Sequence, residues 1–96
     1  MEVPVISTDV LARYASDAAQ EVEGVSALTR EAAEVTGNAE KGDVVVHLEL
    51  EWGAGAENVA RLVQERVAEY LERMTNFEVG SVDVVVERVG APPAKQ

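Results

Sequence analysis

The residues of this chain that have the right types for metal chemistry are few. His47 is the only histidine, and it stands two positions before Glu49 in a run that alternates apolar and polar residues. This spacing places both side chains on one side of a strand, as two metal ligands would be placed. A transition metal usually needs about three or more protein ligands, and the chain has no cysteine and no second histidine. We therefore expect no metal site.

Two other patterns could suggest an active site. Gly53 and Gly55 precede an expected helix, as glycines do in loops that bind phosphate. Glu51 and Glu57 would repel phosphate there, and the Lys-Ser/Thr of phosphate loops is missing. His47 could pair with a serine, but no nucleophile-elbow motif surrounds any of the chain's serines, which are Ser7, Ser16, Ser26 and Ser81. The sequence thus predicts no catalytic residue, no cofactor and no enzyme.

Composition and charge narrow the remaining classes of protein to which this chain could belong. The chain has 96 residues, of which 47% are hydrophobic, so one globular domain is expected over residues 1–90, with a disordered tail at 91–96. Its formal net charge is −10, which would repel the phosphates of nucleic acids and anionic lipids. No signal peptide and no apolar run of about 20 residues is visible, so a cytoplasmic protein without direct membrane insertion is expected.

Two segments have the periodicity of amphipathic helices. Residues 8–23 begin at Thr8, a residue that can cap a helix, and end before Gly24, which suits a left-handed cap. Residues 57–74 form the stronger pattern. Their expected buried stripe consists of Val59, Leu62, Val63, Val67, Tyr70, Leu71 and Met74.

Strand patterns flank the second helix. Residues 44–52 alternate, so that Val44, Val46, Leu48, Leu50 and Trp52 are expected to face the core. Residues 82–89 form the last strand, and residues 3–6 suit an edge strand or an extended arm. Residues 27–36 could be strand or helix, although a hairpin would need a strand at roughly residues 32–36. We expect an α+β fold of the αββαβ type, with two helices packed on one face of a small mixed sheet of three to four strands.

The sheet face opposite the helices is the candidate partner-binding surface. On the alternation of the two strands it carries Val45, His47, Glu49, Val85, Glu87 and Val89. Exposed valines beside acids form a mixed apolar and acidic patch, which often marks a partner or self-association surface. The alternative is a second packing layer supplied by the N-terminal arm or the tail.

Several short motifs, taken in order, resemble one known family. They are ISTDVL at 6–11, AAQEVEGV at 18–25, Asn58-Val59 and Val63-Gln64 in the second helix, RMTNFEV at 73–79 and VDVVV at 82–86. In this order the chain resembles the alkaline shock protein (Gls-type) family of the bacterial cell-envelope stress response over residues 3–89. The family often has glycine where this chain has Asn76, and asparagine tolerates the left-handed conformation such a turn would need.

The resemblance implies a non-enzymatic protein-interaction or scaffold domain. Its partners would be an integral-membrane anchor protein, other copies of itself, or both, which would hold a cytoplasmic protein at the membrane. One alternative is a small nucleic-acid-binding α/β domain, which the net charge and the missing Gly-x-x-Gly clamp disfavour. The other is a ligand-binding or enzymatic domain, which would need a deep pocket with convergent polar groups.

Overall fold

Two helices and three strands make up the part of the chain that the structure describes. The computed structural model describes residues 7–38 and 40–91, without the side chains of residues 29–32. The elements follow the order α1 (Thr8–Gln20), β1 (Val25–Gly37), β2 (Lys41–Leu50), α2 (Ala56–Met74) and β3 (Glu78–Val89). The candidate strand at 3–6 and the tail from residue 92 lie outside the described residues, while Ala91 lies in no helix or strand.

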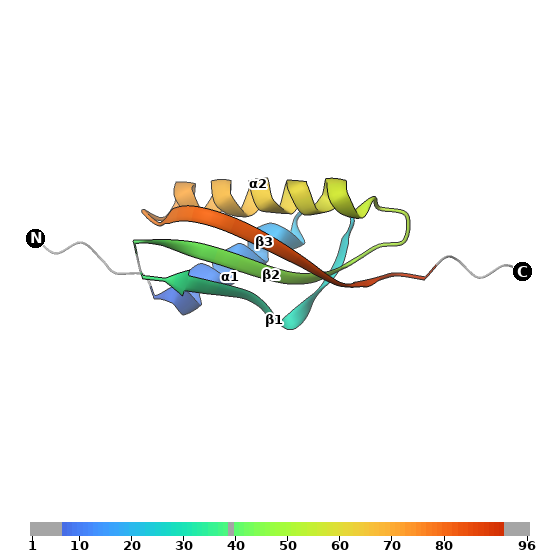
Figure 1. The fold of residues 1–96 in the computed structure, drawn as a ribbon, viewed down its shortest axis with the longest axis horizontal. Coiled ribbons are helices and arrows are strands. Elements are labelled where there is room, and N and C mark those ends of the chain that lie inside the picture. The colour runs from blue at the N-terminus through green and yellow to red at the C-terminus, as the bar shows by residue number, and fades with distance from the viewer. Residues whose placement is uncertain (1–6, 39, 92–96) are drawn as a thin grey trace, which may run out of the picture.

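The sheet is mixed and has the order β1-β2-β3. β1 and β2 form an antiparallel hairpin, and β3 returns parallel to β2 after the α2 crossover. Both helices lie on one face of this sheet, and in Figure 1 the strands pass in front of α1. The expected α+β fold with two helices on one face of a small mixed sheet is therefore confirmed.

Apolar and polar residues alternate along β2, and the apolar ones form the part of the core that the sheet contributes. Its inward side chains Val44, Val46, Leu48 and Leu50 are at most 1% exposed. The helices cover them with small and branched side chains, which include Leu11, Ala15, Ala18, Val59, Val63, Val67 and Leu71. Because β2 lies between both neighbours and beneath both helices, it organises the described part of the molecule.

Helix α1 starts at Thr8 as expected, but its capping residue is the one before. Ser7, rather than Thr8, is the N-cap, and its hydroxyl accepts a hydrogen bond of 3.3 Å from the Val10 amide. The helix ends at Gln20, three residues before the expected end, and a short turn then leads to Gly24. Helix α2 matches the expected range, starting one residue earlier.

β1 is much longer than the short strand expected near residues 32–36. It runs antiparallel along β2, so residues 27–36 are strand and not helix. Two shifts in register, between Val25 and Ala27 and between Leu28 and Ala33, interrupt its alternation. These irregularities explain why no period of two is visible in the sequence, since each extra residue moves the following side chains to the other face.

Several side chains assigned to the core by periodicity are exposed. Trp52 is 58% exposed because β2 ends at Leu50 and the chain turns through Gly53. On α2, Leu62 and Met74 are 40% and 52% exposed, so the buried stripe is narrower than predicted. Tyr70 is partly buried and stacks edge-on against Tyr14 of α1, with ring centroids 6.0 Å apart.

The turn after α2 uses a hydroxyl rather than a left-handed residue. Thr75 accepts a 3.0 Å hydrogen bond from the Phe77 amide and donates one of 2.6 Å to the Leu71 carbonyl. Asn76 has a negative φ, since every positive φ among the described residues belongs to a glycine. Asn76 therefore does not take the left-handed conformation considered for it, and Phe77 is pulled into the core at 2% exposure.

Gly24 joins α1 to the sheet at a place where no side chain fits. Its φ is +102°, and an added Cβ would lie 2.7 Å from a methyl carbon of Val59 on α2. We expect Gly24→Ala to lower the free energy of unfolding by about 2–3 kcal/mol, from left-handed strain and from displacement of Val59. Urea denaturation measures this loss, and a change below about 0.5 kcal/mol would contradict the close approach of α2.

Candidate functional site

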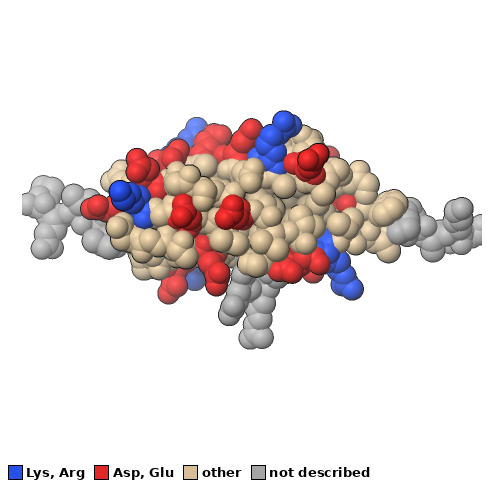
Figure 2. Space-filling view, viewed as in Figure 1, with Lys and Arg blue, Asp and Glu red and all other residues tan. Residues whose placement is uncertain are grey.

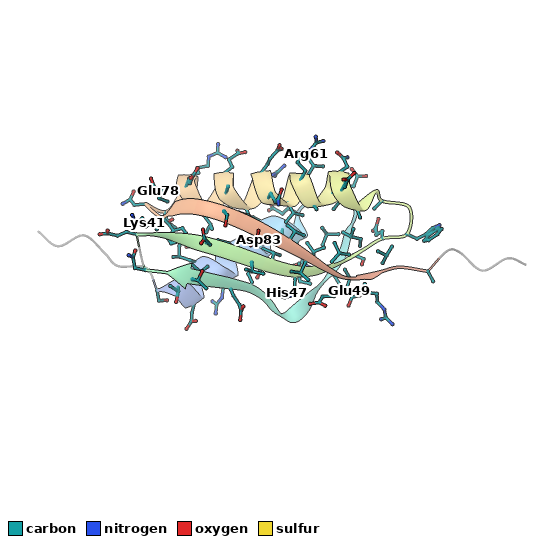
Figure 3. All side chains as sticks on the ribbon, in the orientation of Figure 1. Lys41, His47, Glu49, Arg61, Glu78 and Asp83 are labelled. Carbon is teal, nitrogen blue, oxygen red and sulfur yellow. The ribbon has the colours of Figure 1, made fainter. Side chains whose placement is uncertain are left out.

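The outward sheet face is the surface on which most of the predicted partner-binding residues meet. Val45, His47 and Glu49 alternate with the buried residues of β2 and are each partly exposed. The parallel register sets Val45 beside Asp83 and His47 beside Val85 of β3. Figure 3 shows His47, Glu49 and Asp83 along this side of the strands. Neither helix covers this face, because both pack on the opposite one.

One polar contact joins the two strands across this face. The Nδ1 atom of His47 lies 2.7 Å from a carboxylate oxygen of Glu87, and the two side chains are 29% and 45% exposed. This hydrogen bond holds the imidazole ring against β3 next to Val85. Since the contact is exposed to solvent, it orients the side chains more than it stabilises the fold.

A bulge moves the end of β3 out of the predicted pattern. Val86 pairs with Leu48 but Arg88 pairs with Glu49, so Glu87 is an extra residue without a direct partner on β2. The alternation shifts by one there, and Arg88 comes to lie beside Glu49 on the outward side. Val89 pairs with the core-facing Leu50 and is 48% exposed at the end of the sheet. The structure thus brings together five of the six predicted residues and places Val89 apart from them.

The hairpin register adds acids that the sequence analysis did not assign to this face. Glu34 of β1 pairs with Val45, so that Glu34, Val45 and Asp83 form one row across the three strands. Asp43 lies further along the same side and accepts a 3.1 Å hydrogen bond from the Ser81 hydroxyl. The alternation of β3 in the sequence was enough to place Asp83 on this face. Placing Glu34 there required the register of β1, which cannot be inferred from the sequence because of the two register shifts.

The face is apolar at its centre and acidic around it. Val85 is 38% exposed and lies beside His47, between the Asp83 row and the pair of Glu49 and Arg88. In Figure 2, which views this side of the molecule, acidic side chains are spread around a largely uncharged surface. Such an arrangement suits a partner that offers both an apolar side chain and positive charge.

The described residues offer little for other kinds of site. No side chain that is both buried and polar or charged occurs among them, and no group of three or more His, Cys, Asp or Glu residues could hold a metal. A surface hollow at the start of α2 is lined by Glu57, Asn58 and Arg61, all of them exposed. Within the described helices, none is long and apolar enough to cross a membrane.

Comparison with known proteins identifies the fold. No family model and no curated protein matches the chain. Among solved structures, a zinc form of an Asp-to-Asn variant of the MamM C-terminal domain matches with a TM-score of 0.67 and 15% identity, covering 86% of this chain and 87% of that one. A His-to-Glu variant of the same domain matches with a TM-score of 0.66 and 17% identity, covering 83% of this chain and 93% of that one. At such identities the chain is similar to these domains in fold alone.

Proposed function

We propose that this chain is a non-enzymatic protein-interaction domain whose outward sheet face binds a membrane-anchored protein. The observation that carries the proposal is the sheet face that both helices leave uncovered. It presents Val45 and Val85 among Glu34, Glu49 and Asp83. Burying exposed valines gains about 25 cal/mol per Å² of apolar surface, while the surrounding acids select a partner with positive charge.

The same charges bear on the other candidate functions. A nucleic acid would bring phosphates against this acidic face, and the net charge of −10 adds repulsion at long range. The proposed setting is the cytoplasmic side of the membrane, where the flanks of membrane-spanning helices are enriched in Lys and Arg. Attachment to such a protein, and a role in the cell-envelope stress response, is what the sequence resemblance supports.

The similar structures show where a domain of this fold can occur. They are MamM C-terminal domains, one of them in a zinc form and another in a nickel form. A domain of this fold can therefore be one part of a larger protein. Among the described residues of the present chain, no group of three or more His, Cys, Asp or Glu side chains could hold a metal. The proposal for this chain is contact between proteins.

A capture experiment with matched variants tests this function. The tagged chain is incubated with detergent-solubilised membranes of its native host, beside a Val45→Lys/Val85→Lys variant. We expect one integral-membrane protein to be enriched, and its recovery to fall about tenfold in the variant, because two lysines replace the apolar centre and place positive charge among the acids. The control is Leu62→Lys, which places a single lysine at an exposed apolar position on α2 and should leave recovery unchanged.

Two outcomes would overturn parts of the proposal. Equal recovery with the wild-type chain and the sheet-face variant would move the binding surface away from Val45 and Val85. Enrichment of no membrane protein by the wild-type chain would contradict the membrane anchor itself. Circular dichroism of all three proteins shows whether a loss reflects altered binding or an altered fold.

A further inference from the structure

The outer edge of β3 is a second surface with the properties of an interaction site. In the described sheet, β3 pairs with β2 on one side only. On its other side, the carbonyl of Val82 accepts a 2.9 Å hydrogen bond from the side chain of Gln64 on α2. The backbone groups of a strand point alternately to its two sides. Val82, Val84 and Val86 therefore direct their N–H and C=O groups away from β2.

Two irregularities limit this edge to a short regular segment. The register shifts once between Val79 and Ser81 and again between Val86 and Arg88, so Gly80 and Glu87 are the extra residues. Between them, residues 81–86 pair with β2 without interruption. The outward-directed backbone groups of this segment belong to three valines, and Val84 is the middle one.

This segment has little of the protection that exposed edges usually carry. Natural edge strands are often guarded by lysine, proline or inward-pointing charges. The sequence of residues 81–86 is SVDVVV, with one charge at Asp83 and no proline. Val84 and Val86 point towards the helix layer yet remain partly exposed, and Val85 is 38% exposed on the other face. The edge therefore offers apolar side chains on both sides of a backbone that, among the described residues, is covered by Gln64 at the Val82 carbonyl.

We propose that β3 pairs with β3 of a second copy of this chain, antiparallel and with the two-fold axis at Val84. In this register Val84 meets Val84 of the second copy, and Val82 meets Val86 of the second copy. The outward-directed backbone groups other than the Val82 carbonyl, which already accepts from Gln64, then give about four hydrogen bonds between the chains. The sheets of the two copies join into one continuous sheet, with the helices on the same side.

The charges on the edge favour this register over its neighbour. With the axis at Val84, Asp83 faces the uncharged Val85 of the second copy. With the axis at Val85, Asp83 would face Glu87 of the second copy, and like charges directly opposite each other are destabilising. In that register the hydrogen-bonded pairs would be Val84 with Val86 of the second copy, while Val82 would meet Arg88 of the second copy, which lies beyond the bulge at Glu87. An isologous contact of this kind is self-complementary, as a two-fold dimer requires.

The adjoining side of α2 leaves room for the second copy. Gln64 reaches Val82, so the helix row that includes it lies above the edge of β3. Residues four apart share a row on a helix, which places Ala60 and Ala68 beside Gln64. These small side chains allow the helix layer of the second copy to approach. The proposal goes beyond the proposed function, because it uses the edge of β3, whereas the membrane partner uses the sheet face.

Disulfide cross-linking reads the register directly, because the chain has no cysteine of its own. Asp83→Cys and Val85→Cys are made as single variants with different tags and are mixed in a glutathione redox buffer. In the proposed register, positions 83 and 85 of opposite chains form a non-hydrogen-bonded pair, with Cβ atoms about 4.5–5.5 Å apart, close to disulfide distance. We expect the mixed dimer to form about tenfold faster than the dimer of Val85→Cys with itself.

Two results of this experiment would overturn the proposal. Faster cross-linking of Val85→Cys with itself would place the axis at Val85 instead of Val84. Equal and slow cross-linking in every combination would show that the β3 edges do not meet. Since the cysteines are exposed, neither result depends on a change in the core.

Sedimentation of the unmodified chain provides the independent readout. A contact as small as one strand pair is weak, so a dimer is expected at about 0.1–1 mM chain and not at about 1 µM. Because each copy carries a formal charge of −10, the dimer fraction should rise when salt is increased from about 0.05 M to about 0.5 M. A monomer at all of these concentrations and salt levels would contradict the proposal.

A proline variant distinguishes pairing of the β3 edges from binding of the membrane partner. Val84→Pro removes an N–H that points away from β2, so the ladder within the sheet is retained while the dimer is lost. Val84→Thr keeps the N–H and the branched shape and should keep the dimer. Capture of the membrane protein should be unchanged in Val84→Pro. Failure of the edge contact and failure of the sheet-face function are thus distinguishable, since Val84→Pro removes the dimer and leaves capture of the membrane protein unchanged.

Discussion

Replacing Leu48 by alanine is expected to lower the free energy of unfolding by about 3–5 kcal/mol. Leu48 is fully buried in the middle of β2, beneath both helices and between β1 and β3. The truncation removes apolar surface from the core and leaves a cavity that four surrounding elements cannot easily close. A domain of this size has a total stability of roughly 5–10 kcal/mol, so the variant would be close to unfolding at room temperature.

The matched control for this substitution is Val45→Ala on the same strand. Val45 lies on the outward face and is only partly buried, so its truncation should cost about 1 kcal/mol or less. Urea denaturation of both variants, followed by circular dichroism, gives the two free energies. Losses of equal size would mean that the two faces of β2 are not the buried and the open faces described here.

The second large effect is expected at Gly42, in the hairpin between β1 and β2. Gly42 pairs with Gly37, and a Cβ at Gly42 would collide with the backbone carbonyl oxygen of Thr36. Backbone atoms in a paired strand cannot move aside as the end of a side chain can. Gly42→Ala should therefore lower the free energy of unfolding by about 3 kcal/mol or more, or force the hairpin into a different register.

A second glycine serves as the control for Gly42. Gly53 has a φ of +78°, and a Cβ added there would meet no atom within 4 Å. Its replacement by alanine carries only the cost of the left-handed conformation, about 1–2 kcal/mol. Denaturation measures both costs, and amide chemical shifts of β1 and β2 report any change of register. A smaller loss at Gly42 than at Gly53 would contradict the close approach of the two hairpin strands.

The elements with a clean period were predictable from the sequence. Helix α2 and the inward side of β2 follow from spacing alone, because each has one continuous apolar face. The same reasoning failed at Trp52, where the alternation of residue types continues past the end of the strand. It also failed at Leu62 and Met74, since periodicity gives the side of a helix but not the width that its neighbours cover.

β1 could not be predicted from its own residues. The segment Thr29-Arg30-Glu31 is polar, and the register shifts remove the alternation that identifies a strand. What makes β1 a strand is pairing with β2, which is a tertiary effect and overrides local propensity. The candidate site shows the same limit. Val45, His47 and Val85 were found because their strands alternate, whereas the position of Arg88 depends on the bulge at Glu87, which leaves no signal in the sequence.

The order of the strands along the chain has a consequence during synthesis. Among the described elements β3 is the last to leave the ribosome, yet it completes one side of β2. Until it emerges, the nascent α1, β1, β2 and α2 have an unpaired β2 edge beside apolar side chains that later belong to the core. When several ribosomes translate one messenger RNA, the β3 strand of a neighbouring chain can pair with this β2 edge. Exchange of β3 between chains is therefore a misfolding route open to this topology, and slow translation of residues 78–89 would increase it.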